Sequence, residues 1–507
     1  MVGVVKSFGL NGLNGFAVEV EADVKAGLPN YDLVGLPDKA VKESKERVQS
    51  ALNNSAYIFP AKKITLNLAP ANVQKEGPSF DLAIAISILV ASEQIVSDKY
   101  KGFIILGELS LDGKLRGVTG LLPMLISAKK EGYNKFIIPR LNENEACFIE
   151  GISVYAFNSL IEVAEFLNDE RTAMPLEIKE WHPEDSRFGE DFARVRGQLM
   201  AKRAMEIAVA GGHNILMVGP PGSGKTMLAK CVPGILPDLT FNEALEITKI
   251  HSVAGTLDLK KGVITSRPFR TPHHTATTVA LTGGGAKAKP GEISLAHNGV
   301  LFLDEMPEYK RETLEVLRQP LEDGVITVAR ANATVSYPAN FIMVASMNPC
   351  PCGNYGSREM PCTCSPGQIS KYLGRLSGPL LDRIDLKIDV DRVKFYDLSE
   401  EIDEEPSSEV KKRVNAAREI QLARFKDDGI YCNAKMTSRH IKKFCTLTPE
   451  CRKILEEAFD RFKMSARGYN RILKVARTIA DLANEPNILP AHLIEAIGYR
   501  SIENIHL

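Results

Sequence analysis

The sequence predicts an α/β protein, in which a central core follows an α+β domain and precedes a domain made of helices. Three apolar segments of the central region carry this prediction, because each reads as a buried strand followed by polar residues. The first strand runs into a glycine-rich loop, the second ends in two carboxylates and the third ends near an asparagine. We expect these three strand ends to converge on one phosphate group.

The glycine-rich loop is the most specific of these signals. The apolar run 215–218 leads directly into a match to G-x-x-x-x-G-K-[ST], formed by Gly219, Pro220, Pro221, Gly222, Ser223, Gly224, Lys225 and Thr226. In such a loop, backbone N–H groups and a helix N-terminus surround an anion. Lys225 would neutralise the β- and γ-phosphate oxygens, and Thr226 would place its hydroxyl on Mg²⁺. The expected ligands are ATP and Mg²⁺.

Two later strands supply the other groups of the expected site. The segment 300–305, VLFLDE, is an apolar strand that ends in Asp304 and Glu305. Asp304 is placed to hold the Mg²⁺ shell, and Glu305 is placed to polarise a water against the γ-phosphate. The strand 341–346 ends close to Asn348, which would lie between the other two strands and touch the γ-phosphate.

The composition limits the setting and the partners. Lys plus Arg and Asp plus Glu both number 63, so overall basicity does not indicate nucleic acid. It does not exclude nucleic acid, because a ring of subunits multiplies a few local cations around a pore. The start lacks a signal-peptide pattern, and the longest apolar run, 82–91, is far shorter than the ~20 residues that cross a bilayer. Nine unevenly spread cysteines fit a reduced protein, so we expect a cytoplasmic location and no membrane partner.

The pattern along the 507 residues predicts five segments. Residues 1–170 alternate short β-like runs with amphipathic helical stretches, such as 38–53 and 79–91, and indicate a compact α+β domain. Residues 171–190 are polar, contain the only tryptophan and read as a linker. The core spans 191–390, an acidic, proline-broken linker spans 391–408, and residues 409–507 show helical apolar spacing throughout.

A β-hairpin is predicted over 324–337, GVITVARANATVSY, with its turn at 330–332. The turn carries Arg330, and an exposed arginine on a hairpin tip can grip a DNA phosphate and move with the nucleotide state. A solvated arginine on an ordinary turn explains the same sequence equally well.

A cysteine cluster follows the third strand. Cys350 and Cys352 are separated from Cys362 and Cys364 by a stretch rich in glycine and polar residues. Four thiolates brought together by a loop suit a tetrahedral Zn²⁺ in a structural role, because no ligand position is left open. The C-x-C spacing is tighter than the usual C-x₂₋₄-C, so unliganded thiols are the alternative.

Two further arginines are candidates for contact with nucleotide. Arg383 lies at the edge of a strand, where in a ring it would reach the γ-phosphate of a neighbouring subunit. The alternative is a surface ion pair with Asp382 or Asp385. Arg471, in the helical region, would fold back onto bound nucleotide, and Arg467 competes for the same role.

The first domain resembles the proteolytic domain of Lon-type proteases, which has a ribosomal S5 domain 2-like fold. The resemblance rests on QKEGPSFDLAIAISIL and GELSLDGKLRGVTGLLPMLISAKKEGYNKFIIP. Ser79 occupies the position of the protease serine, but Leu122 stands where the lysine would be, and leucine cannot take the hydroxyl proton. Lys129 and Lys130 lie two helical turns further on. We interpret Ser79 as a helix N-cap or a relic, and the domain as a proteolytically inactive scaffold.

The whole chain resembles the YifB/ComM family of magnesium-chelatase-like AAA+ ATPases. The similar segments are GPPGSGKT, FRTPHHT, PGEISLAHNGVLFLDE, NPCPCG, SGPLLDRIDL and SARGYNRILKVARTIADL. The resemblance implies an αβα core with a helical lid, a homohexamer, and an ATP-driven helicase that binds single-stranded or branched DNA and promotes branch migration in natural transformation. It assigns Walker, sensor and finger roles to Lys225, Thr226, Asp304, Glu305, Asn348, Arg383 and Arg471, and the hairpin order resembles that of minichromosome-maintenance helicases.

Three functions compete under this resemblance. The first is the DNA motor, and the second is a chelatase-type remodeller that acts on a protein partner. The chelatase motor subunit lacks the Lon-like domain, and this chain has no D-x-S-x-S segment typical of the chelatase partner, so both facts favour the DNA motor. The third, an ATP-dependent protease, is opposed by Leu122.

Overall fold

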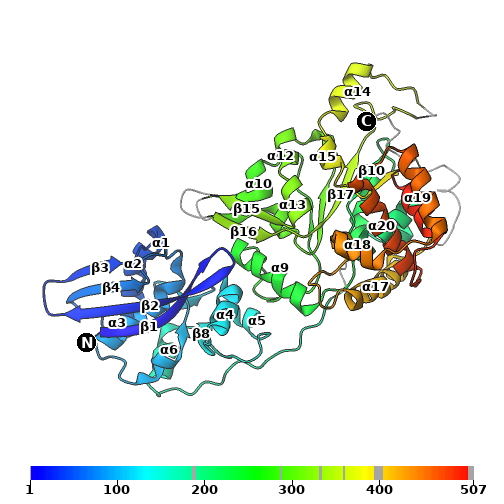
Figure 1. The fold of residues 1–507 in the computed structure, drawn as a ribbon. Coiled ribbons are helices and arrows are strands. Elements are labelled where there is room, and N and C mark those ends of the chain that lie inside the picture. The colour runs from blue at the N-terminus through cyan, green and yellow to red at the C-terminus, as the bar shows by residue number, and fades with distance from the viewer. Residues whose placement is uncertain are drawn as a thin grey trace. The chain divides into compact units, whose positions relative to one another are not determined.

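The structure, a computed structural model, describes residues 2–184, 190–285, 288–329, 334–357, 360–392 and 404–500. The chain, drawn in Figure 1, divides into two compact units. Met1–His182 and Phe241–Thr265 form the N-terminal unit, and Pro183–Thr240 and Ser266–Leu507 form the C-terminal unit. The N-terminal unit therefore extends beyond the boundary expected at residue 170, and it includes a segment that the sequence pattern places in the core.

A seven-stranded mixed sheet forms the centre of the N-terminal unit. The strand order is β3 (Asn30–Val34), β4 (Lys63–Ala69), β2 (Asn14–Lys25), β1 (Val2–Asn11), β5 (Ile104–Ile105), β8 (Lys135–Pro139) and β9 (Ser153–Phe157). β1 and β2 form a long antiparallel hairpin, and β2 also pairs antiparallel with β4. The pairs from β1 to β9 are parallel, so helical crossovers connect those strands.

Helices complete this α+β unit. They are α1 (Lys39–Lys42), α2 (Ser44–Asn54), α3 (Asp81–Ala91), α4 (Leu121–Lys130), α5 (Glu143–Ala146) and α6 (Leu160–Leu167). Every residue of α3 is buried, and α3 packs against β1 and β2. The sequence pattern of an amphipathic helix over 79–91 is therefore wrong, because α3 has no solvent face and is apolar all round.

The structure does not support a cap role for Ser79. Ser79 lies in a short 3₁₀ turn, Pro78–Phe80, and α3 begins at Asp81 with Phe80 at its N-cap and no side-chain cap. The Ser79 side chain is buried. Leu122 is fully buried in the hydrophobic core, and its backbone N–H donates to Glu145 Oε2 at 3.3 Å. The interpretation of Ser79 as a helix N-cap is thus wrong.

The helix α9 (Phe241–Ala254) joins the N-terminal unit through a buried carboxylate. Ser252 in α9 donates to Glu145 Oε2 at 3.0 Å, and Asn142 Nδ2 donates to Glu145 Oε1 at 2.7 Å. Burial raises the pKa of Glu145, and these hydrogen bonds act in the opposite direction. Glu145 is therefore a hub that ties α9 to α4 and α5, which makes the docking specific rather than only hydrophobic.

The tryptophan of the expected linker is part of the same docking. The Trp181 ring packs against Phe241 with a centroid distance of 5.7 Å, and the indole N–H donates to the Ile264 carbonyl at 3.3 Å. Residues up to 182 therefore contact the N-terminal unit, whereas 185–189 lie outside the described residues. The polar composition of 171–190 predicted a linker because it does not reveal that the half-buried Trp181 ring packs on Phe241.

A five-stranded parallel sheet organises the C-terminal unit. Its order is β11 (Phe269–Arg270), β14 (Val300–Leu303), β17 (Ile342–Met347), β10 (Ile215–Val218) and β18 (Leu386–Asp389). All four neighbouring pairs run parallel. Every residue of β10, β14 and β17 is buried, which explains why these strands read as continuous apolar runs rather than as alternating ones.

Two hairpins extend from this core. β15 (Val325–Ala329) and β16 (Thr334–Pro338) pair antiparallel, as the sequence predicts. The turn 330–333, and with it the predicted DNA contact Arg330, lies outside the described residues. A smaller hairpin joins β12 (Gly283–Gly284) to β13 (Lys289–Pro290).

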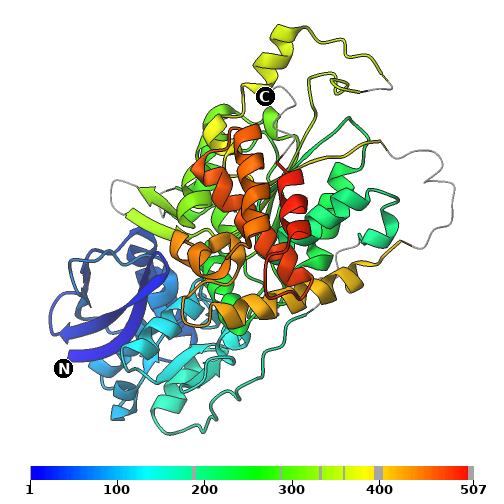
Figure 2. The same ribbon diagram turned by 45° about the vertical axis from the view of Figure 1, so that its right-hand side comes forward.

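Helices make up most of the rest of the C-terminal unit. The helices up to β18 are α7 (Leu199–Gly211), α8 (Lys225–Cys231), α10 (Thr278–Thr282), α11 (Glu292–Leu295), α12 (Arg311–Glu315), α13 (Arg318–Asp323), α14 (Pro366–Leu373) and α15 (Gly378–Leu381). The C-terminal helices, orange to red in Figure 2, are α17 (Ser407–Arg424), α18 (Ser438–Phe444), α19 (Pro449–Arg461), α20 (Ala466–Leu482) and α21 (Pro490–Gly498). One hydrophobic cluster runs from the sheet through α7 into these helices. No helix within the described ranges has the length and apolar character needed to cross a membrane.

We expect Glu145→Ala to loosen α9. The substitution removes the acceptor of three buried donors, so the free energy of unfolding of the N-terminal unit should fall by about 2 kcal/mol. Hydrogen exchange measured by mass spectrometry should show faster exchange in 241–254. Ser252→Ala removes one of these bonds and should cost about 1 kcal/mol. Unchanged exchange of α9 in both variants would contradict the hub.

Candidate nucleotide-binding site

The phosphate loop lies between β10 and α8, as the sequence predicts. Gly222 and Gly224 have φ values of +76° and +89°, the left-handed region that other residues rarely adopt. A Cβ on either glycine would meet no atom within 4 Å, so backbone conformation rather than space demands glycine there. Gly219 differs, because a Cβ there would lie 2.1 Å from the Val390 carbonyl oxygen. The loop is therefore open on its solvent side and closely packed where it leaves the strand.

Lys225 lies inside this loop. Its Nζ donates to the carbonyl oxygens of Gly219 and Pro220, both at 2.7 Å, and lies 3.3 Å from Asn348 Oδ1. Burial lowers the pKa of Lys225, while the carboxylates of Asp304 and Glu305 act in the opposite direction. The ammonium group is thus held in the cradle beside Asn348, and two of the three predicted strand ends meet.

Thr226 and Asp304, the two expected Mg²⁺ ligands, contact each other. Thr226 Oγ1 donates to Asp304 Oδ2 at 3.0 Å. Ser346 Oγ donates to Asp304 Oδ1 and accepts from the backbone N–H of Glu305 at 3.1 Å. A hydroxyl and a carboxylate together are oxygen donors that suit Mg²⁺. Ser346 was not predicted, although it precedes Asn348 by two residues and so shares its face of β17.

Glu305 adopts a backbone conformation that is uncommon for a glutamate. Its φ is +50°, in the left-handed region, and the residue is exposed to solvent. Such a conformation costs about 1 kcal/mol and persists where surrounding contacts enforce it, here the hydrogen bonds of its N–H to Ser346 and Asp304. The turn directs the chain out of the strand immediately after Asp304, so the two adjacent carboxylates lie in different environments.

Gln198 is a second residue that the sequence did not reveal. It lies before α7 with φ at +56°, and its Nε2 donates to the carbonyl oxygens of Ser223 at 3.3 Å and Asp391 at 2.6 Å. It therefore connects the phosphate loop with the start of α7 and the segment after β18. The only signal in the sequence was a glycine and a glutamine directly before the helix.

Arg383 lies at the opposite edge of the sheet. It precedes β18, and its carbonyl oxygen accepts from Nδ2 of Asn214, which precedes β10, at 2.9 Å. The guanidinium pairs with Glu322 and donates to the Pro379 carbonyl at 2.6 Å, while its Nε is buried with no hydrogen-bond partner. The ion pair is thus made with Glu322 and not with Asp382 or Asp385, because α13 brings Glu322 across from a distant part of the chain.

Arg471 also lies at this amino-terminal edge. Its Nε lies 3.4 Å from Asp385 Oδ1, and Asp385 Oδ2 lies 3.2 Å from His213 Nδ1. Burial acts to raise the pKa of Asp385, but the His213 hydrogen bond and nearby cations hold it below its usual value. Burial lowers the pKa of Arg471, although Asp385 opposes this effect. Its Nη1 is buried with no hydrogen-bond partner.

A cavity of about 480 Å³ collects these side chains. It is lined by Arg383, Arg467, Arg471, Lys474, Glu322 and Asp385. Arg467 Nη2 lies 3.5 Å from Glu322 Oε1. A four-residue strand is about 10 Å long or more, so this cavity and the phosphate loop are separated by the length of β10. Arg471 therefore lies at the edge of the sheet opposite the phosphate loop of its own chain, and its contact with nucleotide stays a prediction.

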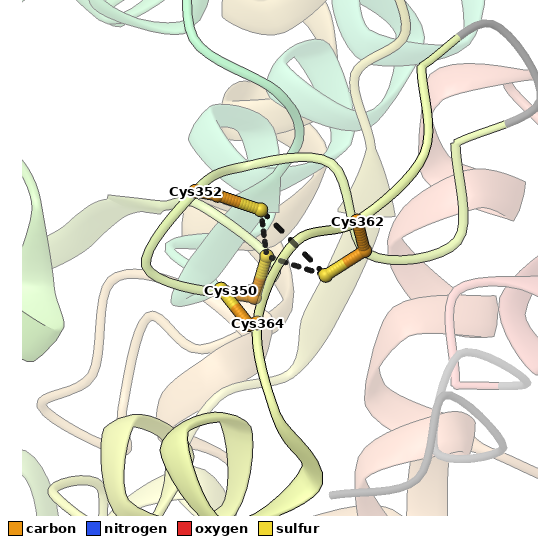
Figure 3. A group of neighbouring side chains, drawn as sticks. All are labelled: Cys350, Cys352, Cys362 and Cys364. Atoms are coloured by element: carbon orange, nitrogen blue, oxygen red, sulfur yellow. Dashed lines mark hydrogen bonds between the residues drawn. The ribbon is translucent and has the colours of Figure 1, made fainter.

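The structure brings the four predicted cysteines together. All four Sγ atoms of Cys350, Cys352, Cys362 and Cys364 lie within 4.8 Å of one another (Figure 3). Among the described residues, no other group of three or more cysteine, histidine or acidic side chains has ligand atoms this close together. The cluster lies directly after β17 and Asn348.

Three segments of the chain match models of protein families, and all three models describe the same class of protein. Residues 191–398 match magnesium chelatase, subunit ChlI, residues 20–142 match subunit ChlI of Mg-chelatase, and residues 404–500 match the C-terminal part of that subunit. The fold and site thus define a magnesium-chelatase-like protein with a phosphate loop. The magnesium-chelatase subunit ChlI-2 of Arabidopsis thaliana is 25% identical over 219 residues, which are 38% of this chain and 50% of that protein.

Two bacterial proteins are similar over nearly the whole length. Competence protein ComM of Haemophilus influenzae is 45% identical over 504 residues, which cover 98% of this chain and 97% of that protein. The uncharacterized protein YifB of Escherichia coli is also 45% identical, with the same shares covered. The chain belongs to the YifB/ComM family of magnesium-chelatase-like proteins.

We expect Ser346→Ala to weaken Mg²⁺-dependent nucleotide binding. Without the Ser346 hydroxyl, Asp304 loses the partner that fixes its carboxylate, so the Mg²⁺ concentration at half-maximal binding of a fluorescent ATP analogue should rise about 10-fold. Ser336→Ala, on the exposed face of β16, is the matched control and should leave that concentration unchanged. Equal Mg²⁺ dependence of the two variants would show that Ser346 does not position Asp304.

Proposed function

We propose that this protein is an ATP-driven motor that assembles into a ring, a homohexamer, and moves DNA. The contact of Thr226 with Asp304, beside Lys225 and Asn348, carries the ATP-hydrolysing part, because the expected Mg²⁺ and phosphate ligands meet there. The family of chelatase motor subunits supports ATP and Mg²⁺ as the ligands. The name of the Haemophilus relative, a competence protein, supports a task in natural transformation, which we take to be branch migration of joint molecules.

The residues of the site have separate tasks in hydrolysis. Lys225 binds the β- and γ-phosphate oxygens, and Thr226 and Asp304 hold Mg²⁺, which when bound neutralises charge on the transferred group. Glu305 accepts a proton from the attacking water, since it is exposed next to Asp304 rather than paired within the strand. Asn348 lies between Lys225 and the position expected for the γ-phosphate, where it distinguishes the triphosphate from the diphosphate.

Two arginines at the amino-terminal edge of the parallel sheet favour assembly of the subunits into a ring. Arg383 and Arg471 each carry a buried guanidinium nitrogen without a hydrogen-bond partner, beside a cavity on the far side of the sheet from the phosphate loop. An unpaired buried donor on a cation favours an anionic ligand. A head-to-tail neighbour would bring its phosphate loop to this cavity, and repetition of such a heterologous contact closes into a ring.

The alternative function is a chelatase-type remodeller that acts on a protein partner. The family matches favour it in part, since all three carry the name of a chelatase subunit. The DNA motor is preferred because the relative that is similar over the full length is named for competence. The alignment with the chelatase subunit of Arabidopsis covers only 38% of this chain. In the motor, we propose that single-stranded or branched DNA is contacted by Arg330, on the hairpin of β15 and β16, and that the N-terminal unit is an inactive Lon-like scaffold.

The proposed function predicts that DNA stimulates ATP hydrolysis. We expect turnover of Mg²⁺–ATP to rise severalfold with single-stranded or four-way DNA, and the stimulation to fall as salt concentration increases, because phosphate contacts release counterions. Glu305→Gln should bind ATP and DNA yet hydrolyse ATP slowly, which controls for binding. ATP hydrolysis that is indifferent to DNA but rises with a protein partner would favour the remodeller.

The ring predicts complementation between two inactive variants. Lys225→Ala abolishes ATP binding in its own subunit, and Arg383→Ala removes the arginine offered to the neighbour, so each alone should lose about 10³-fold in turnover. Mixed in equal amounts, they should regain activity at about a quarter of the interfaces. Arg471→Ala in place of Arg383→Ala tests the arginine of the helical region, and Arg467→Ala tests its competitor. If mixing restores nothing, Arg383 does not act between subunits.

A further inference from the structure

The four cysteines have the spacing of a tetrahedral metal site. Cys350 Sγ lies 3.4 Å from Cys352 Sγ and 3.7 Å from Cys362 Sγ, and the latter two atoms are 3.6 Å apart (Figure 3). Zn–S bonds of about 2.3 Å in a tetrahedron place neighbouring sulfurs about 3.8 Å apart. All four cysteines are free thiols. Since Cys364 Sγ also lies within 4.8 Å of the other three sulfurs, all four are close enough to bind one zinc-sized ion.

Backbone amides point at these sulfurs. The Tyr355 N–H donates to Cys350 Sγ at 3.3 Å. The backbone N–H groups of Asn354 and Thr363 also donate to the Cys352 sulfur, and such donors favour the thiolate that a metal binds. The turn after Cys352 is closed by Gly353, whose φ is +81°. Such N–H donors to ligand sulfurs are the outer contacts that hold a thiolate metal site in shape.

The cysteine segment adjoins the nucleotide site at two places. It begins two residues after Asn348, which lies next to Lys225. A Cβ on Gly353 would lie 2.3 Å from Pro221 Cδ, so the turn between Cys352 and Asn354 packs directly on the phosphate loop. The fixed position of the cysteines is therefore connected both to the group that contacts the γ-phosphate and to the loop that surrounds it.

The helix after the cluster returns to the same position. α14 begins just after Cys364 and is held at its start by a capping box between Ser365 and Gln368. At its other end, the buried Tyr372 receives a hydrogen bond from the backbone N–H of Asn348. The described parts of 348–372 therefore begin and end at Asn348, and the four cysteines lie between these two ends.

We propose that Cys350, Cys352, Cys362 and Cys364 bind one Zn²⁺. The metal fixes the cysteine segment and thereby keeps Asn348 in place beside the phosphate loop. All four positions are filled by thiolates, so the metal is structural and leaves no site for water. The link to ATP turnover rests on the proposed function, whereas the metal site itself does not. Loss of the metal lets this segment unfold locally, and Asn348 then loses its fixed position beside Lys225.

The first test is the metal content of the full-length protein purified without added metal. We expect about one zinc per chain by mass spectrometry of the elements. Titration of the thiols with a mercurial should release that zinc as four thiols react. Exchange into Co²⁺ should give the visible bands of a tetrahedral thiolate site. Protein without stoichiometric metal that also fails to take up Zn²⁺ or Co²⁺, or that contains iron instead, would overturn the proposal of zinc.

The second test separates a metal role from a folding defect. The Cys364→Ser variant should lose its zinc, and its ATP turnover should fall at least about 10-fold. The Cys364→His variant should keep its zinc and its ATP turnover, because three thiolates and an imidazole still bind zinc. Cys147→Ser, at a buried cysteine outside the cluster, should change neither. If the protein contains zinc but its loss leaves ATP turnover unaltered, the link between the metal and Asn348 is wrong. Zinc in a wild-type protein that hydrolyses no ATP would instead contradict the proposed function.

Discussion

The parallel alignment of β10, β14 and β17 is the constraint on which the candidate site depends. Parallel strands place all their carboxyl ends at one edge, so Lys225, Asp304 and Asn348 meet although they are far apart in sequence. The bonds of Ser346 to Asp304 and to the backbone of Glu305 depend on that register. A shift of β17 by one residue would turn Ser346 to the other face of the sheet and dissolve this set of contacts.

The same alignment makes the two edges of the sheet chemically different. Hydrogen-bond donors suited to phosphate lie at the carboxyl edge, while guanidinium groups and Asp385 lie at the amino edge. Asp385 joins the sheet to α20, because it contacts both His213 and Arg471. Under the proposed function, neither edge is a complete catalytic site alone.

The predicted fold was most accurate where burial leaves a simple pattern. The continuous apolar runs of β10, β14 and β17 follow from burial on both faces, and the alternation over 324–337 follows from one face of a hairpin. The pattern failed where the partner lies far away in sequence. Nothing local in 241–254 indicates that Ser252 meets Glu145. Likewise, Arg383 has two acidic neighbours in sequence and pairs with neither, since α13 brings in Glu322.

By itself, the sequence determined the identities of the phosphate loop, the carboxylates after β14 and the four cysteines, because backbone conformation and ligand chemistry act over a few adjacent residues. Only the tertiary structure decided which side chains share an edge of the sheet. It separated Arg471 from the phosphate loop of its own chain, added Ser346 and Gln198 to the site, and placed Gly353 of the cysteine segment against Pro221. Those contacts join residues distant in sequence, so they arise only when the strands pair and the helices pack.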